Sequence, residues 1–159
     1  MGARAEALAK QFEAKAQEAT AVLEKLSDAD WKKVTSSEKW TVGVVAHHMA
    51  SAHEPIAGIA KAVATGQSKG EMTLDMLNQM NAKHAAEHAN TSKSETIALH
   101  KKNVAAAATV VRSLNDADLD KSGPVLAGMP PMTAEQVAKG ILMNHMEEHL
   151  GSIRKTLGA

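Results

Sequence analysis

The sequence predicts an all-α protein, a four-helix bundle with one additional short helix between the second and third long helices. Two observations carry this prediction. The apolar residues are mostly Ala, Val, Leu and Met, a mixture that favours helix over strand, and aromatic residues make up only 2% of the chain. Apolar positions also recur three and four residues apart along most of the sequence, which is the spacing of one helix face.

Length, charge and cysteine content restrict the class of protein. A chain of 159 residues can bury one hydrophobic core, so we expect residues 1–159 to form a single domain. Lys+Arg and Asp+Glu balance at 18 each, which gives no net field to attract nucleic acid or an anionic membrane. With no cysteine there is no disulfide, thiolate ligand or cysteine nucleophile. No apolar run is long enough to span a membrane and no signal-peptide pattern is visible, so we expect a cytoplasmic protein.

The first half of the chain predicts two long helices. The first spans about Ala3 to Leu26 and ends at a Ser-Asp-Ala-Asp stretch, and residues 31–39 are interpreted as a connecting segment. The second begins near Trp40, with Thr41 as its N-cap, and closes in the Gly- and Ser-containing stretch 65–70. Pro55 lies inside the second helix, where a kink is expected because proline cannot donate the usual backbone hydrogen bond.

The second half predicts one short and two long helices. Residues 73–88 form a shorter, less regular pattern, and a capping box at residues 92–95 opens the next long helix. Residues 121–132, rich in glycine and proline, are expected to lack regular structure. Residues 133–136 then cap the last helix, whose apolar residues recur every fourth position from Val137.

A pair of histidines on the last helix is the strongest chemical signal. His145 and His149 are four residues apart, so their side chains lie on one face of a helix, at or beside its inward stripe. Two such imidazoles can share a divalent metal ion if a third ligand arrives from elsewhere. His48 falls on the inward stripe of the second helix and is our candidate for that third ligand. Three protein ligands and one open position are typical of a catalytic zinc-type centre.

The other histidines are assigned by the faces of their helices. His47 points about 100° away from its neighbour, so we interpret it as solvent-facing or as supporting the ligands. The pair His84 and His88 has the same spacing as the last-helix pair and is a rival metal site or a solvated helix end. His100 lies on an inward stripe, as a fourth ligand, a substrate contact or, the interpretation we favour, a hydrogen-bonded core histidine. His53 is interpreted as a surface residue.

Two stretches together resemble the DinB/YfiT-like superfamily of four-helix metalloproteins. One is Trp40 followed eight residues later by His48, and the other is the last helix from Met132 through His145 and His149. Residues 77–81 and 114–119 are more weakly similar to the middle of that family. The resemblance implies a four-helix bundle with a zinc- or nickel-like divalent ion held by these three histidines; His47 would take the place of its neighbour if the helix register differed.

The resemblance also implies a kind of chemistry. Relatives in that superfamily are thiol-dependent transferases or isomerases that use low-molecular-weight thiols such as mycothiol or bacillithiol, and dimers are common among them. For this chain the resemblance therefore implies a small-molecule substrate or ligand, a low-molecular-weight thiol as cofactor, and it allows a homodimer. Neither nucleic acid nor a membrane is expected as a partner.

Three hypotheses for function stay open at this point. The first is a metal-dependent enzyme that activates a small thiol or water, with an electrophile entering near the loop of residues 123–132. The second is a bundle that binds metal or a small ligand without turnover, in a stress-response or regulatory role. The third is a bundle with incidental histidines. Glu147 and Glu148 lie between the paired histidines and are expected on a solvated face, or else orienting an imidazole.

Overall fold

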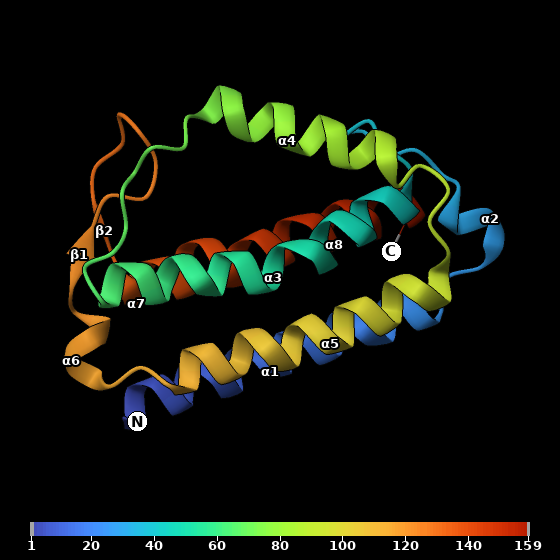
Figure 1. Ribbon diagram of the computed structural model, residues 1–159. Helices are drawn as coiled ribbons and strands as arrows, with labels where there is room; N and C mark the ends of the chain where they lie inside the picture. The colour runs from blue at the N-terminus through green and yellow to red at the C-terminus, as the bar shows by residue number, and fades with distance from the viewer. Residues whose placement is uncertain (1, 159) are drawn as a thin grey trace.

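Long helices form most of the computed structural model, which describes residues 2–158 (Figure 1). The long segments are α1 (Ala3–Glu24), α3 (Val42–Ala64), α5 (Lys93–Arg112) and a C-terminal run from Ala134 to Leu157. Helix α5 packs along both α1 and α3, and the C-terminal run packs mainly on α3. The all-α prediction is confirmed, and the chain adds two short helices that the sequence pattern did not predict, α2 (Asp28–Trp31) and α6 (Asp116–Leu119).

The apolar stripes of the long helices meet in one core, with α3 at its centre. Helix α3 is buried on most of its circumference, because α5 and the C-terminal run cover different faces of it. Many of the buried positions are alanines, which let the helix axes approach closely. The largest apolar side chains that are fully buried are Phe12, Leu23, Met49, Leu119, Leu142, Met146 and Ile153.

Hydroxyl side chains begin the helices at the predicted places. Thr41 accepts a hydrogen bond from the backbone N–H of Val44 at 3.2 Å, and Ser92 accepts one at the start of α5. Thr73 does the same for α4 (Leu74–Glu87), the predicted short helix. Thr133 and the side chain three residues later form a reciprocal capping box at the start of the C-terminal run. The helix starts were therefore readable from sequence.

The C-terminal run is not one regular α-helix. It consists of α7 (Ala134–Gln136), the π-helix η1 (Val137–Met143) and α8 (Asn144–Leu157). A π turn closes its hydrogen bonds over five residues instead of four, so it changes the angle at which every later side chain leaves the helix. Beyond η1 the buried stripe is Met146, Leu150 and Ile153, and the histidines of α8 border it.

Two predictions on irregular segments need correction. Residues 31–39 hold more structure than a simple connection, because Val34 and Thr41 form an isolated antiparallel bridge. Residues 121–132 are not wholly irregular, since β1 (Ser122–Gly123) pairs antiparallel with β2 (Met132–Thr133). Helix α3 contains Pro55 as predicted and continues through it as a single element, and the kink expected there stays a prediction.

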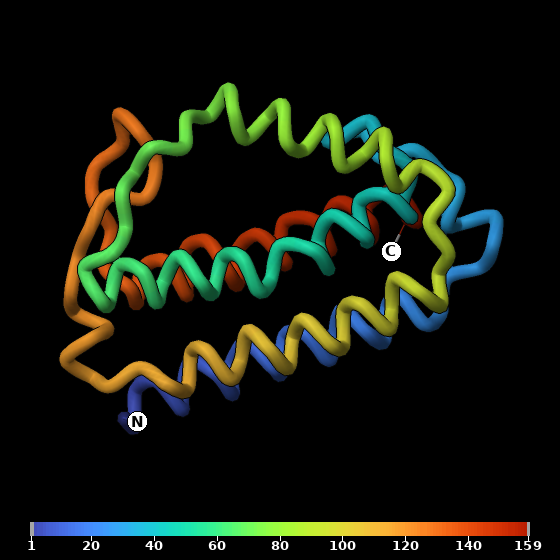
Figure 2. Tube along the Cα trace, viewed as in Figure 1, coloured from blue at the N-terminus to red at the C-terminus, as the bar shows by residue number. Residues whose placement is uncertain are grey.

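The tube view in Figure 2 places these elements relative to the ends of α3. The β1–β2 segment lies at the C-terminal end of α3, where Gly123 approaches Val63. The N-terminal end of α3 lies beside the turn that precedes it and beside the end of α4. Within residues 2–158, no helix is both long enough and apolar enough to cross a membrane.

Candidate metal centre

The structure brings the three predicted ligands together beside the N-terminal half of α3. His48 projects from α3, and His145 and His149 project from α8. The Nε2 atoms of His145 and His48 are 3.0 Å apart, and those of His149 and His145 are 3.2 Å apart. His48 is buried, and the other two rings are half-buried.

The donor set fits a divalent ion better than it fits hydrogen bonding alone. Three nitrogens that bind one tetrahedral ion at about 2.05 Å lie about 3.3 Å from one another, close to the two distances observed. A neutral imidazole carries one N–H, so the Nε2 atom of His145 cannot satisfy both of its ring-nitrogen contacts at once. Its Nδ1 atom is also buried without a hydrogen-bond partner. A bound cation would instead take up the Nε2 lone pairs for which no N–H donor is available.

Burial keeps the rings of His48 and His145 uncharged. Desolvation, followed by the two neighbouring imidazoles, lowers the pKa of His48 from 6.5 to about 3. Desolvation and the nearby His149 lower the pKa of His145 to about 4. Near pH 7 both rings are therefore neutral, the state in which imidazole binds a metal ion.

Glu38 orients one of the ligands. Its Oε2 atom lies 2.7 Å from the Nδ1 atom of His149, and Ser152 donates a hydrogen bond to its other oxygen at 2.5 Å. Desolvation raises the pKa of Glu38, but hydrogen bonds from Ser152, His149 and Thr35 outweigh it and lower the pKa below 4.5. The carboxylate thus holds the His149 proton on Nδ1 and turns the Nε2 lone pair toward the other imidazoles.

The turn before α3 positions this glutamate. The backbone of Thr35 donates to the carbonyl of Trp40 at 2.8 Å, and the N–H of Lys39 donates back to Thr35 at 3.1 Å. Lys39 has a φ of 62°, a left-handed conformation that costs energy for a residue with a side chain. The Trp40 ring packs edge-on against His48 with centroids 5.4 Å apart, so the same turn also supports the α3 ligand.

Sequence reasoning missed Glu38 because it lies in a segment without helical periodicity. The only available signal was its position two residues before the tryptophan of the family motif. The glutamates that the sequence did offer lie elsewhere: Glu147 pairs with Lys15, and Glu148 accepts a hydrogen bond from Asn144. Both are exposed, which confirms the solvated face and leaves the imidazole-orienting role to Glu38.

The remaining histidines fall into two further groups. His53 is buried, which makes its assignment to the surface wrong, and its Nε2 atom is 3.0 Å from the Nδ1 atom of His100. His100 also contacts the carbonyl of Ala16 at 3.3 Å, as expected of a hydrogen-bonded core histidine. His47 is half-buried and lies 2.8 Å from His84, so it faces neither solvent nor the ligands of the first cluster.

A cavity of some size lies away from the three ligands. It has a volume of about 590 Å³ and is formed by the β1–β2 loop and the start of the C-terminal run. No histidine lines it within the part of the chain that the structure describes. Since β1 approaches Val63, fifteen residues after His48, the loop lies about 22 Å along α3 from that ligand. The expectation that an electrophile enters beside this loop therefore finds no support in the geometry.

Comparisons with known proteins identify the fold. A model of the DinB superfamily matches residues 11–153. The chain is similar to the crystal structure of the mycothiol-dependent maleylpyruvate isomerase, with a TM-score of 0.71 and 14% identity, and to that of a histidine-to-alanine variant of it, with a TM-score of 0.72 and 12% identity. Each comparison covers 94% of this chain but only 59% of the isomerase chain. No curated protein matches the sequence significantly.

Proposed function

The chain belongs to the DinB superfamily, and from this premise we propose that it is a metal-dependent enzyme acting on a small molecule. In this proposal His48, His145 and His149 hold one divalent ion, zinc or nickel, since both suit imidazole ligands. A small thiol or a water molecule takes the open position. The observation that carries the proposal is the convergence of three imidazole nitrogens from two helices, with contacts of 3.0 and 3.2 Å.

The protein contributes orientation and a dry, uncharged ligand set. Glu38 fixes the tautomer of His149, and the exposed fractions of their side chains are only 10% and 16%. A divalent ion on neutral ligands favours the thiolate form of a bound thiol, or lowers the pKa of bound water to about 7. The chain has no cysteine, so the thiol has to be a separate molecule. The fold likeness to a mycothiol-dependent isomerase supports a low-molecular-weight thiol in that role.

The test measures metal content and thiol transfer on the same samples. Purified protein is loaded with Zn²⁺ or Ni²⁺ and given mycothiol or bacillithiol with 1-chloro-2,4-dinitrobenzene. Transfer forms a carbon–sulfur bond, releases chloride and passes the thiol proton to the buffer. We expect the loaded protein to accelerate the reaction and the double variant His48→Ala/His149→Ala to lose one equivalent of metal together with the acceleration. Wild-type protein that binds no metal, or a double variant that binds as much metal as wild type, would refute the proposal.

A second candidate, a bundle that binds metal or a small ligand without turnover, is favoured by a different observation. The 590 Å³ cavity, the natural place for a substrate of some size, is lined by no histidine in residues 2–158. Metal retention without acceleration by either thiol would support this candidate. A homodimer stays a prediction from the family resemblance, to be tested by light scattering.

A further inference from the structure

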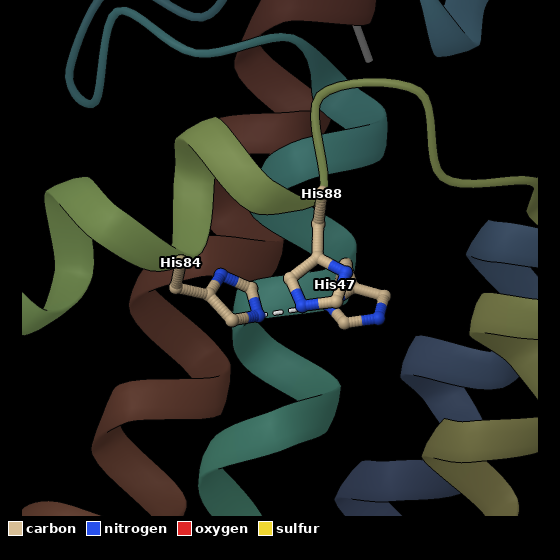
Figure 3. Close-up of side chains that lie close together, drawn as sticks. All are labelled: His47, His84 and His88. Carbon is tan, nitrogen blue, oxygen red and sulfur yellow. Dashed lines mark hydrogen bonds between the residues drawn. The ribbon is translucent and has the colours of Figure 1, made fainter.

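Three histidines outside the first cluster lie together where α4 meets α3. His47 comes from α3, His84 from the last turn of α4, and His88 follows that helix directly. Each offers a ring nitrogen within 4.8 Å of the other two. Figure 3 shows the edge of His84 directed at His47 while His88 lies across His47; the last two rings stack with centroids 4.0 Å apart.

Hydrogen bonding satisfies this second cluster only in part. The Nδ1 atom of His47 is 2.8 Å from the Nε2 atom of His84, and the hydroxyl of Ser51 lies 3.3 and 3.2 Å from these atoms. Ser51 donates its only proton to the carbonyl of His47 at 2.8 Å, so it has none for either ring. One proton shared between His47 and His84 therefore holds their two nitrogens together, and a cation on both lone pairs would replace that proton.

Little else attaches the C-terminal end of α4 to the molecule. No side chain of α4 is buried, and Leu74, Met76 and Met80 are about half exposed. Its main packing partner is α3. Figure 2 shows α4 running apart from α3 along most of its length and approaching it at the end that carries His84. Within residues 2–158, the side-chain hydrogen bonds that join α4 to α3 are those of His84 with His47 and Ser51.

We propose that His47, His84 and His88 form a second site for a divalent transition-metal ion, which fastens the end of α4 to α3. Three imidazoles from two separate elements are a ligand set that zinc, nickel and copper accept. The site is distinct from the first cluster, although the rings of His48 and His84 are only 5.8 Å apart. It does not depend on any catalytic activity.

Metal stoichiometry tests the site directly. The full chain is stripped with chelator, titrated with Zn²⁺ alone, passed through a desalting column and analysed for zinc. We expect wild type to retain about two equivalents and His84→Ala/His88→Ala to retain about one. His145→Ala/His149→Ala should also retain about one, which separates the second site from the first. The matched control is Lys83→Ala/Glu87→Ala, an exposed pair on the same turns of α4, which should retain about two.

Hydrogen exchange tests the fastening of α4. We expect Zn²⁺ to slow amide exchange over residues 74–88 at least tenfold in wild type and in His145→Ala/His149→Ala, and to leave it unchanged in His84→Ala/His88→Ala. Since α4 buries no side chain, its histidines can be replaced without unfolding the bundle, and circular dichroism verifies this. A His84→Ala/His88→Ala variant that retains as much zinc as wild type overturns the proposed site. Exchange of α4 that ignores the metal overturns the fastening.

Discussion

Helices α8 and α4 carry the same histidine motif but differ in how firmly they pack against the rest of the protein. Each is 14 residues long and carries two histidines four residues apart. His145 and His149 lie in the first half of α8, and His84 and His88 lie in the last turn of α4 and directly after it. Helix α8 buries Met146 and two other apolar side chains in the core, whereas α4 buries none. The motif alone therefore specifies the spacing of two ligands but not the rigidity of the element that holds them.

The packing of each helix decides how much of it must become ordered when a metal ion binds. On α8 the packing of the helix and the hydrogen bond from His149 to Glu38 fix the imidazoles before any ion arrives. On α4 the ion would also have to order the helix end, and that cost is subtracted from its binding free energy. We expect the α8 cluster to be the tighter site.

The largest expected difference between the two helices concerns stability. Met146→Ala removes a fully buried side chain of α8 and should lower the free energy of unfolding by about 2–5 kcal/mol. Met80→Ala, at a half-exposed position of α4, should change it by less than about 0.5 kcal/mol. Urea denaturation of the metal-free variants measures both. Similar losses for the two would show that α4 is packed more firmly than its exposure indicates.

The hydrogen bond that orients His149 in the α8 cluster can be removed without replacing a ligand. Glu38→Ala leaves the His149 tautomer free and should reduce Zn²⁺ affinity at the first site by about 10- to 100-fold. Competition with a chromophoric chelator measures the affinity. The control is Glu147→Ala/Glu148→Ala on the exposed face of α8, which should bind as wild type does. If both variants bind Zn²⁺ equally well, the Glu38 carboxylate does not orient His149 for metal binding.

Acidification should weaken the bundle through its buried histidines. Desolvation, with the nearby His100 and His145, lowers the pKa of His53 from 6.5 to about 3. The unfolded chain then binds more protons than the folded one between these values, so stability is full above pH 6.5 and falls as the pH drops toward 3. The loss approaches about 1.4 kcal/mol per pH unit for one such group. Urea titrations of metal-free protein from pH 7 to 4 measure it, and His53→Gln should flatten the slope.

The smallest expected effect lies at the α4 cluster. Ser51→Ala removes a hydroxyl next to His47 and His84 but leaves all three proposed ligands, so affinity at the second site should fall by no more than about tenfold. Affinity at the first site should stay as in wild type. Zinc titrations in a His145→Ala/His149→Ala background isolate the second site. A larger loss than that of His84→Ala would mean that the hydroxyl, not the imidazole, is the ligand.

Periodicity made the long helices and the first cluster predictable. His48, His145 and His149 lie on or beside apolar stripes, so their meeting followed from the packing of amphipathic helices. His53 was misplaced because the stripe was assumed to be the only buried face of α3. Helix α5 covers another face of it, and His53 lies there between Phe12 of α1 and His100 of α5, so it is buried although it lies off the stripe.

Contacts that depend on the tertiary arrangement could not be predicted from the periodicity of apolar residues. Glu38 reaches His149 through a turn of irregular backbone with a left-handed Lys39, and no periodicity marks such a turn. His47 and His84 were judged separately, on different helices, and the crossing of α4 over α3 that joins them has no local signal.

The π-helix η1 decides which way the histidines of α8 face. A π turn contains one residue more than an α turn, so the same residues wound as a regular α-helix would turn His145 and His149 by about 100° about the helix axis relative to the Thr133 cap. Deleting one residue from Val137–Met143 at the same time would bring both side chains back to nearly their present direction. The extra residue thus couples the length of this segment to the meeting of His145 and His149 with His48.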